Sequence, residues 1–171
     1  MLKQYRMFAD YNRWANALVY DAASELTEAE FHDDRGAFFG SLAGTLNHLL
    51  TADRIWMKRF TGHGDAPVKL NSLLHDDLAS LRRARQVEDQ RIIDWVNGLD
   101  ETTLAGTFTY TPITQPIEIT QPLWAAVSHF FNHQTHHRGQ CHTTLTALGK
   151  PSLVLDLVYY LRADGKQWLE S

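Results

Sequence analysis

The sequence predicts an all-α protein: an up-down four-helix bundle with a small β-hairpin inserted between the third and fourth long helices, and a short helix near the C-terminus. Four long segments carry apolar residues at helical spacing, and their connections contain turn-forming Gly and Pro. One stretch between the last two long segments alternates as β-strands do. No repeat or low-complexity segment appears in the chain. Because 171 residues fit a single domain, we expect one domain over residues 1–171.

The first long helix is expected over residues 2–24. Its apolar stripe, at i, i+3 and i+4 spacing, consists of Phe8, Tyr11, Ala15, Leu18 and Ala22. Asn12 and Asn16 lie beside this stripe, where polar side chains need hydrogen-bond partners. The two asparagines either support a functional site or hydrogen-bond a neighbouring helix, and the pattern favours neither.

The second long helix is expected over residues 41–60, with an apolar arc of Leu42, Leu46, Leu49, Trp56 and Phe60. Asp53 falls within this arc, where a carboxylate must form an ion pair, bind a ligand or shift its pKa. It either pairs with another helix or orients a ligand histidine. His48 lies about 120° from the centre of the arc, and periodicity alone does not show what it faces.

The third long helix is expected over residues 72–97. Arg85 and Glu88 interrupt its apolar face at helical spacing, so we expect them to pair with each other or with another helix. The basic cluster of Arg82, Arg83 and Arg85 is matched by nearby acidic residues. We interpret this cluster as a solvated helix face.

Residues 107–120 alternate polar and apolar positions around a proline-containing turn, which predicts a short β-hairpin. The fourth long helix follows over residues 122–148 and ends at a Gly-Lys-Pro sequence. A short final helix is expected over residues 153–161. The tail after it is mostly polar, with Trp168 able to pack back on the bundle.

Three residues of the fourth long helix are predicted to point away from the core: Trp124, Phe131 and Gly139. An outward stripe of large aromatic side chains with a glycine indicates a surface for a partner. A homodimer is the simplest such assembly.

Composition excludes several classes of function. A net charge of -4 argues against nucleic-acid binding through bulk charge. No apolar run approaches the length of a membrane span, and no N-terminal run resembles a signal peptide. The chain has one cysteine, Cys141, and therefore no intrachain disulfide framework, so we expect a cytoplasmic protein. Cys141 is either a nucleophile or, as is more usual for a lone cysteine on an apolar arc, an inert packed residue.

Five of the nine histidines fall within residues 128–142 of the fourth long helix. His133 and His137 are four residues apart, so their side chains lie one turn apart on one face and can reach a single ion. Both lie on or at the edge of the apolar arc, whereas the other three lie on the flank or surface: His129, His136 and His142. The spacing indicates a metal site, and the alternative is a pair of partly buried histidines bonded to other polar groups.

Several other site chemistries are absent from the sequence. There is no Glu-x-x-His, which di-iron bundles require, and no His-Glu-x-x-His of the thermolysin type. The serine hydrolase elbow and the phosphate-binding loop are also missing. What remains is a histidine-only site, and three imidazoles would leave an open position for water or substrate.

Three segments carry a resemblance to a known family: Asp-Tyr-Asn-Arg-Trp-Ala-Asn at residues 10–16, the stretch from Leu46 to Trp56, and Asn-His-Gln-Thr-His-His-Arg-Gly-Gln at residues 132–140. Over nearly its whole length the chain resembles the DinB-like (DinB/YfiT) superfamily of metalloenzymes. The resemblance implies a four-helix bundle, commonly dimeric, that holds Zn or Ni through three histidines. Those positions fall on His48, His133 and His137.

The resemblance also implies an activity, because characterised relatives include thiol-dependent S-transferases and isomerases. Our leading hypothesis is a metal-dependent S-transferase that uses a low-molecular-weight thiol and a small-molecule substrate. Arg138 or Arg85 could hold a carboxylate of the thiol, although Arg138 is predicted to point outward. The alternatives are a non-catalytic stress-response or interaction protein that binds metal, and a metal-dependent hydrolase. The sequence assigns no catalytic residue, and an all-imidazole site suits Zn, Ni, Cu and Fe alike.

Overall fold

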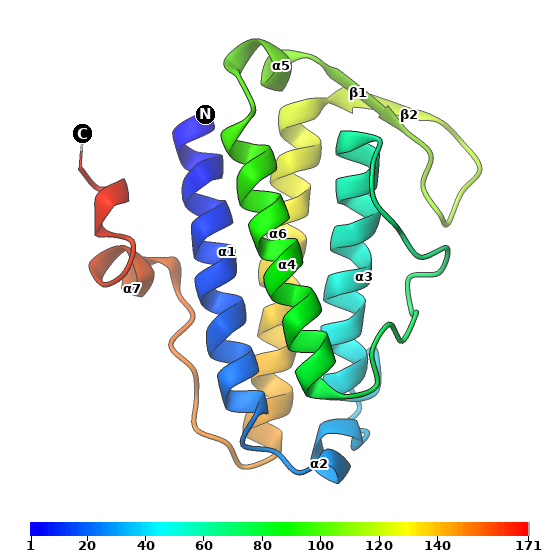
Figure 1. Cartoon of the computed structure of the whole chain (residues 1–171). Helices are drawn as coiled ribbons and strands as arrows, with labels where there is room; N and C mark the ends of the chain where they lie inside the picture. Colours follow the sequence, from blue (N-terminus) through cyan, green and yellow to red (C-terminus); the bar gives the residue numbers. More distant parts are fainter. Residues whose placement is uncertain (171) are drawn as a thin grey trace.

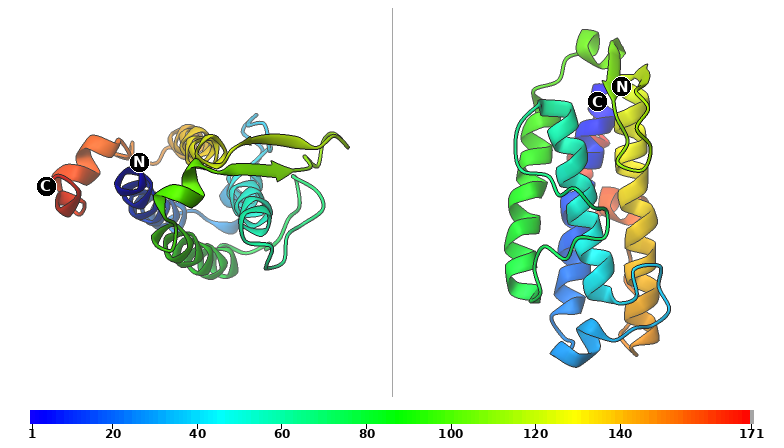
Figure 2. Two further views of the ribbon diagram at one scale, coloured as in Figure 1. Left: turned by 90° about the horizontal axis from the view of Figure 1, so that it is seen from above. Right: turned by 90° about the vertical axis from the view of Figure 1, so that its right-hand side faces the viewer.

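The computed structural model describes residues 1–170, in which four long helices pack side by side (Figure 1). These helices are α1 (Leu2–Ala23), α3 (Leu42–Thr61), α4 (Leu78–Asn97) and α6 (Leu123–Ala147). Helices α1 and α3 each pack against both α4 and α6, as the view along the bundle in Figure 2 shows. The predicted all-α bundle with its small hairpin insertion is confirmed.

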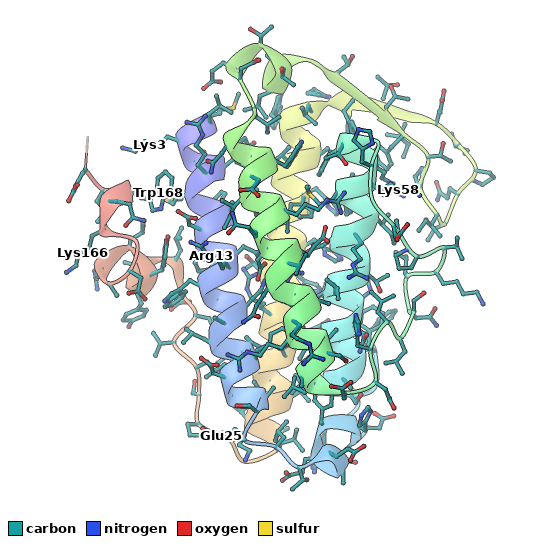
Figure 3. All side chains as sticks on the ribbon, in the orientation of Figure 1. Lys3, Arg13, Glu25, Lys58, Lys166 and Trp168 are labelled. Atoms are coloured by element: carbon teal, nitrogen blue, oxygen red, sulfur yellow. The ribbon has the colours of Figure 1, made fainter. Side chains whose placement is uncertain are left out.

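The shorter elements lie at the ends and sides of the bundle: α2 (Glu28–His32), α5 (Glu101–Ala105), β1 (Thr107–Tyr110), β2 (Ile119–Pro122), α7 (Leu157–Arg162) and the 3-10 helix η1 (Lys166–Trp168). Strands β1 and β2 form an antiparallel hairpin in which Thr107 is opposite Pro122. The final helix begins four residues later than predicted, at Leu157. Trp168, labelled in Figure 3, packs against Tyr160 and α1 as expected.

The direction of α4 departs from simple alternation of helices. Ion pairs and hydrogen bonds join Asp53 to Arg85 and Thr61 to Arg91, so α3 and α4 run parallel. The connection over residues 62–77 therefore runs back along the bundle, and α4 begins at Leu78 instead of residue 72 (Figure 1). The buried side chain of Asn47 explains why: it accepts hydrogen bonds from the backbone N–H groups of residues 74 and 75 and donates one to the carbonyl of residue 75. These bonds hold the connection in extended form beside α3.

A small apolar cluster around Tyr11, Ala15 and Tyr160 joins α1 to α7, and two large clusters form the core of the bundle. One surrounds Trp56, Met57, Ile92, Val96 and Phe130. The other, nearer to α2, surrounds Val19, Leu42, Leu46, Leu50, Leu81, Cys141 and Leu145. Between the two lies a layer of buried polar and charged side chains, which we call the charged layer: Asn12, Asn16, Asp53, Arg85, Asp89, Gln134 and Arg138. All four long helices contribute to it.

The charged layer corrects two predictions. Arg85 was expected on a solvated face, which is wrong because it is buried. Its expected pairing with another helix is confirmed by an ion pair with Asp53 of α3 at 2.5 Å, beside a second one with Asp89 at 3.1 Å. Arg138 was expected to point outward, but it is buried and donates hydrogen bonds to Asn12 and Asn16 of α1. Opposite charges and amide oxygens on the facing helices compensate these buried cations. The apolar spacing of a single helix does not reveal which polar side chains its neighbours will bring.

Phe131 is a third correction, because it was predicted to be exposed and is buried against Tyr5 and Phe8 of α1. Helix α6 packs on both α1 and α3, so its buried surface is wider than one apolar arc. Trp124, by contrast, is 43% exposed, and nothing lies within 4 Å of where a side chain at Gly139 would begin, as predicted for both. Within residues 1–170 no helix combines the length and the apolar character needed to cross a bilayer.

Candidate metal centre

The three histidines singled out by the sequence meet on the facing sides of α3 and α6. His48 comes from α3, and His133 and His137 come from successive turns of α6. One ring nitrogen of each lies within 4.8 Å of the other two. The Nε2 atoms of His48 and His133 are 3.4 Å apart. Two nitrogens bound at about 2.0–2.1 Å to one tetrahedral ion would be separated by about 3.3–3.4 Å, so this pair already has a suitable spacing.

The outer nitrogens of two of these rings have partners that orient them. His48 Nδ1 lies 2.8 Å from the carbonyl oxygen of Leu70, in the connection that Asn47 holds beside α3. His137 Nδ1 lies 2.7 Å from Oε1 of Gln140, one turn further along α6. Since both oxygens accept, each Nδ1 carries the proton, and each Nε2 is left with a lone pair. This is the arrangement by which outer hydrogen bonds orient metal-binding histidines.

Burial keeps the group, which we call the histidine group (His48, His133 and His137), in its neutral form. Burial, reinforced by the neighbouring His137 and His48, lowers the pKa of His133 to about 3. Burial lowers the pKa of His137 to about 4, against the opposing effect of the Gln140 hydrogen bond. Burial likewise lowers the pKa of His48. Neutral imidazole is the form that binds a metal ion, so these three residues could hold one near neutral pH without first losing protons.

Phe39 covers one side of the histidine group, a role that sequence spacing did not predict. Its ring stacks on His48 at a centroid distance of 3.8 Å and lies 5.6 Å from His137. Gly44 on α3 permits this approach, because a Cβ there would meet the Phe39 carbonyl oxygen at 2.1 Å. The available signal was a pair of aromatic residues immediately before the Gly-Ser that opens α3.

A cavity of about 230 Å³ opens beside the histidine group, between α3, α6, the connection after α3 and the hairpin. His48 and His133 line one part of it, and aromatic and apolar side chains line much of the rest. Trp56 lies against His129 at 5.2 Å and against Tyr110 of the hairpin at 5.0 Å. The hairpin, predicted only as an insertion, therefore supplies a wall of this cavity.

Asp53 does not orient a ligand histidine, and that alternative was wrong. Its partners are Arg85 and Gln134 in the charged layer. The Leu70 carbonyl and Gln140 instead orient the histidines, by accepting hydrogen bonds from His48 and His137. Asn12 and Asn16 bond to Asp89 and Arg138 of neighbouring helices, which decides between the two roles considered for them.

Cys141 has the environment of a packed residue. It is buried in the apolar cluster near α2, and burial raises the pKa of its thiol to about 12. A thiol that stays protonated near neutral pH is a poor nucleophile. Arg138 and Arg85 are equally removed from a role at the site, because both are committed to the charged layer.

Comparisons with known proteins agree with the resemblance seen in the sequence. A family model described as the DinB family matches residues 1–170. Protein DinB of Bacillus subtilis (strain 168) is 26% identical over 162 residues, a match that covers 89% of this chain and 90% of that protein.

Proposed function

We propose that this chain, which belongs to the DinB family, is a single-domain metal-dependent S-transferase that holds one divalent ion through His48, His133 and His137. The observation that carries the proposal is the convergence of three neutral imidazoles, two of them oriented by outer hydrogen bonds. Zn or Ni fits this donor set. A divalent ion with an open position lowers the pKa of a thiol or water and polarises a carbonyl.

The reaction joins a thiol to an electrophile. The sulfur forms a bond to an electrophilic carbon, the leaving group departs with the electron pair of the broken bond, and the thiol loses its proton to solvent. The chain's own residues provide the setting for this step. Phe39 shields one side of the histidine group, and the cavity beside it gives a small apolar substrate a place to pack against Trp56 and Tyr110.

The first test is the metal content of untagged protein, measured by elemental analysis. We expect about one Zn or Ni per chain, and loss of that metal in His48→Ala and in His137→Ala while the helical circular dichroism signal persists. His63→Ala is the matched control, because His63 is exposed on the connection after α3 and lies outside the histidine group. Wild-type protein that stays free of metal even after incubation with zinc or nickel would overturn the proposal.

The second test separates the S-transferase from its alternatives. Conjugation of a thiol to an electrophile should require both the metal and the thiol, and should fall to background in His137→Ala. Turnover that persists without thiol would instead favour a metal-dependent hydrolase.

One observation favours a second candidate, a binding protein that works as a homodimer or with another partner. Trp124 at the start of α6 is 43% exposed. In this case Trp124→Ala should lower the molar mass measured by light scattering and leave metal content unchanged. An unaltered mass would argue against a partner surface at Trp124.

A further inference from the structure

The cavity beside the histidine group contains one cationic side chain, Arg59 of α3. Its guanidinium contacts two adjoining aromatic rings, 4.8 Å from the centroid of Trp56 and 4.9 Å from that of Tyr110, whose own centroids are 5.0 Å apart. It donates one hydrogen bond, from Nη2 to the carbonyl oxygen of Thr111 at 3.1 Å. A guanidinium has five N–H donors, so most of those of Arg59 are left for a ligand.

Arg59 differs from the other arginines that α3 and α4 bury or half-bury. Arg85 pairs with Asp53 and Asp89, and Arg54 and Arg91 both pair with Glu88. Within residues 1–170, Arg59 has no carboxylate within ion-pair distance, and none of the residues lining the cavity is acidic. Among the described residues, the cavity therefore presents a cation that contacts two rings and has no counterion.

The positions of Arg59 and the histidine group on α3 give the span between them. Trp56 lies eight residues after His48, which corresponds to about 12 Å along the helix axis. The Arg59 side chain leans back along α3 and stacks on Trp56. On α6, His129 bridges the same gap, 5.9 Å from His133 and 5.2 Å from Trp56. An anionic group at Arg59 would thus lie about 12 Å from a group at the histidines.

We propose that Arg59 binds the carboxylate of the thiol substrate, which is a small thiol with an apolar chain and a carboxylate about 12 Å from its sulfur. This inference rests on the proposed function, since it assumes that the sulfur lies at the histidine group. Contact with the two adjoining rings holds the planar guanidinium in place for two-pronged carboxylate binding, and the same rings offer the apolar chain a surface to pack against. Arg59 thus takes the role considered for Arg138 and Arg85.

The test is isothermal titration calorimetry of zinc-loaded protein with 8-mercaptooctanoate, whose extended chain suits this span. We expect Arg59→Gln to weaken binding about tenfold, because a charge-assisted hydrogen-bonded pair is lost, and Arg59→Lys to restore part of it. The methyl ester of the same thiol should bind the wild type and Arg59→Gln equally. So should 3-mercaptopropionate, which is too short to reach Arg59.

Lys58→Gln is the matched control, because Lys58 is the exposed neighbour of Arg59 and its loss removes the same charge without touching the cavity (Figure 3). Equal weakening in Lys58→Gln, or wild-type binding of 8-mercaptooctanoate by Arg59→Gln, would overturn the carboxylate subsite and leave the thiol chemistry standing. If neither the acids nor the ester bound to wild-type protein, the proposed function would fail, and the subsite with it.

Discussion

The charged layer and the histidine group adjoin each other on α3 and α6 but satisfy their polar atoms in opposite ways. In the charged layer, Asp53 of α3 meets Arg85 and Gln134, and Asp89 meets Arg85 and two asparagines. Each carboxylate there has more than one partner. In the histidine group, which lies five residues before Asp53 on α3 and next to Gln134 and Arg138 on α6, three ring nitrogens converge. Those of His48 and His137 present lone pairs, because the opposite ring nitrogens donate to oxygens.

Whether buried polar side chains have partners within the protein distinguishes those that stabilise the bundle from those that can bind a ligand. Buried charges persist in a core when the facing helices compensate them, and the charged layer meets that condition within the protein. The converging imidazoles have no opposite charge beside them, and an ion with empty coordination positions would be bound by their lone pairs. The unsatisfied region is thus the candidate site, although the satisfied one contains more charge.

The largest effect should come from breaking the charged layer. Arg85→Met removes the partner of both Asp53 and Asp89 and leaves two carboxylates buried, so we expect a loss of about 3–5 kcal/mol in the free energy of unfolding. Urea denaturation measures this loss. Arg82→Met is the control, because its pair with Asp21 is solvent-exposed and should contribute less than about 1 kcal/mol. Similar losses in the two variants would show that the layer is not a stabilising unit.

Local sequence patterns predicted the helices, whereas features that depend on contacts between distant segments could not be predicted. Helical spacing located the four long helices to within a few residues, except for the start of α4. That start depends on Asn47, a residue of α3 far from it in sequence, which fixes the preceding connection by hydrogen bonds. The parallel course of α3 and α4 requires a connection that runs back along α3, and these bonds hold it there in a way that no local pattern encodes.

Within the site, the i, i+4 spacing on α6 identified His133 and His137 as neighbours, whereas His48 required the family resemblance. Helical periodicity shows which side of a helix faces the core of the bundle. It could not place His48, because this residue is buried by α6, by Phe39 in a loop and by the connection after α3. Phe39 and Arg59 escaped prediction for the same reason. Their importance depends on what a loop and a hairpin bring close, and sequence spacing carries no information about that.

A smaller effect should come from loosening the orientation of one histidine. Gln140→Ala removes the acceptor for His137 Nδ1, so the ring and its tautomer are no longer fixed. We expect zinc affinity to fall by about 10–100-fold, as is usual when such an outer partner is lost. Competition with a chromogenic chelator measures this affinity. Thr143→Ala, an exposed change on the same helix, should leave it unaltered, and an equal effect in both variants would contradict the role of Gln140.

The smallest effect is the response of the metal-free protein to pH. The pKa of His133 falls to about 3 in the folded state, mainly through burial, whereas an unfolded histidine has a pKa of about 6.5. Between these values the unfolded chain binds the additional proton, so stability rises with pH and is lost as pH falls below about 6.5. His133→Gln removes this linkage. Its unfolding free energy, measured in EDTA, should therefore fall less between pH 7 and pH 5 than that of the wild type. We expect a difference of about 1 kcal/mol over this range, after allowance for solvent screening. His63→Gln at the exposed connection should keep the wild-type slope. Equal pH dependence of the unfolding free energy in the wild type and His133→Gln would mean that His133 can be protonated in the folded state at no cost. The histidine group would then be open to water, contrary to what the stacking of Phe39 on His48 indicates.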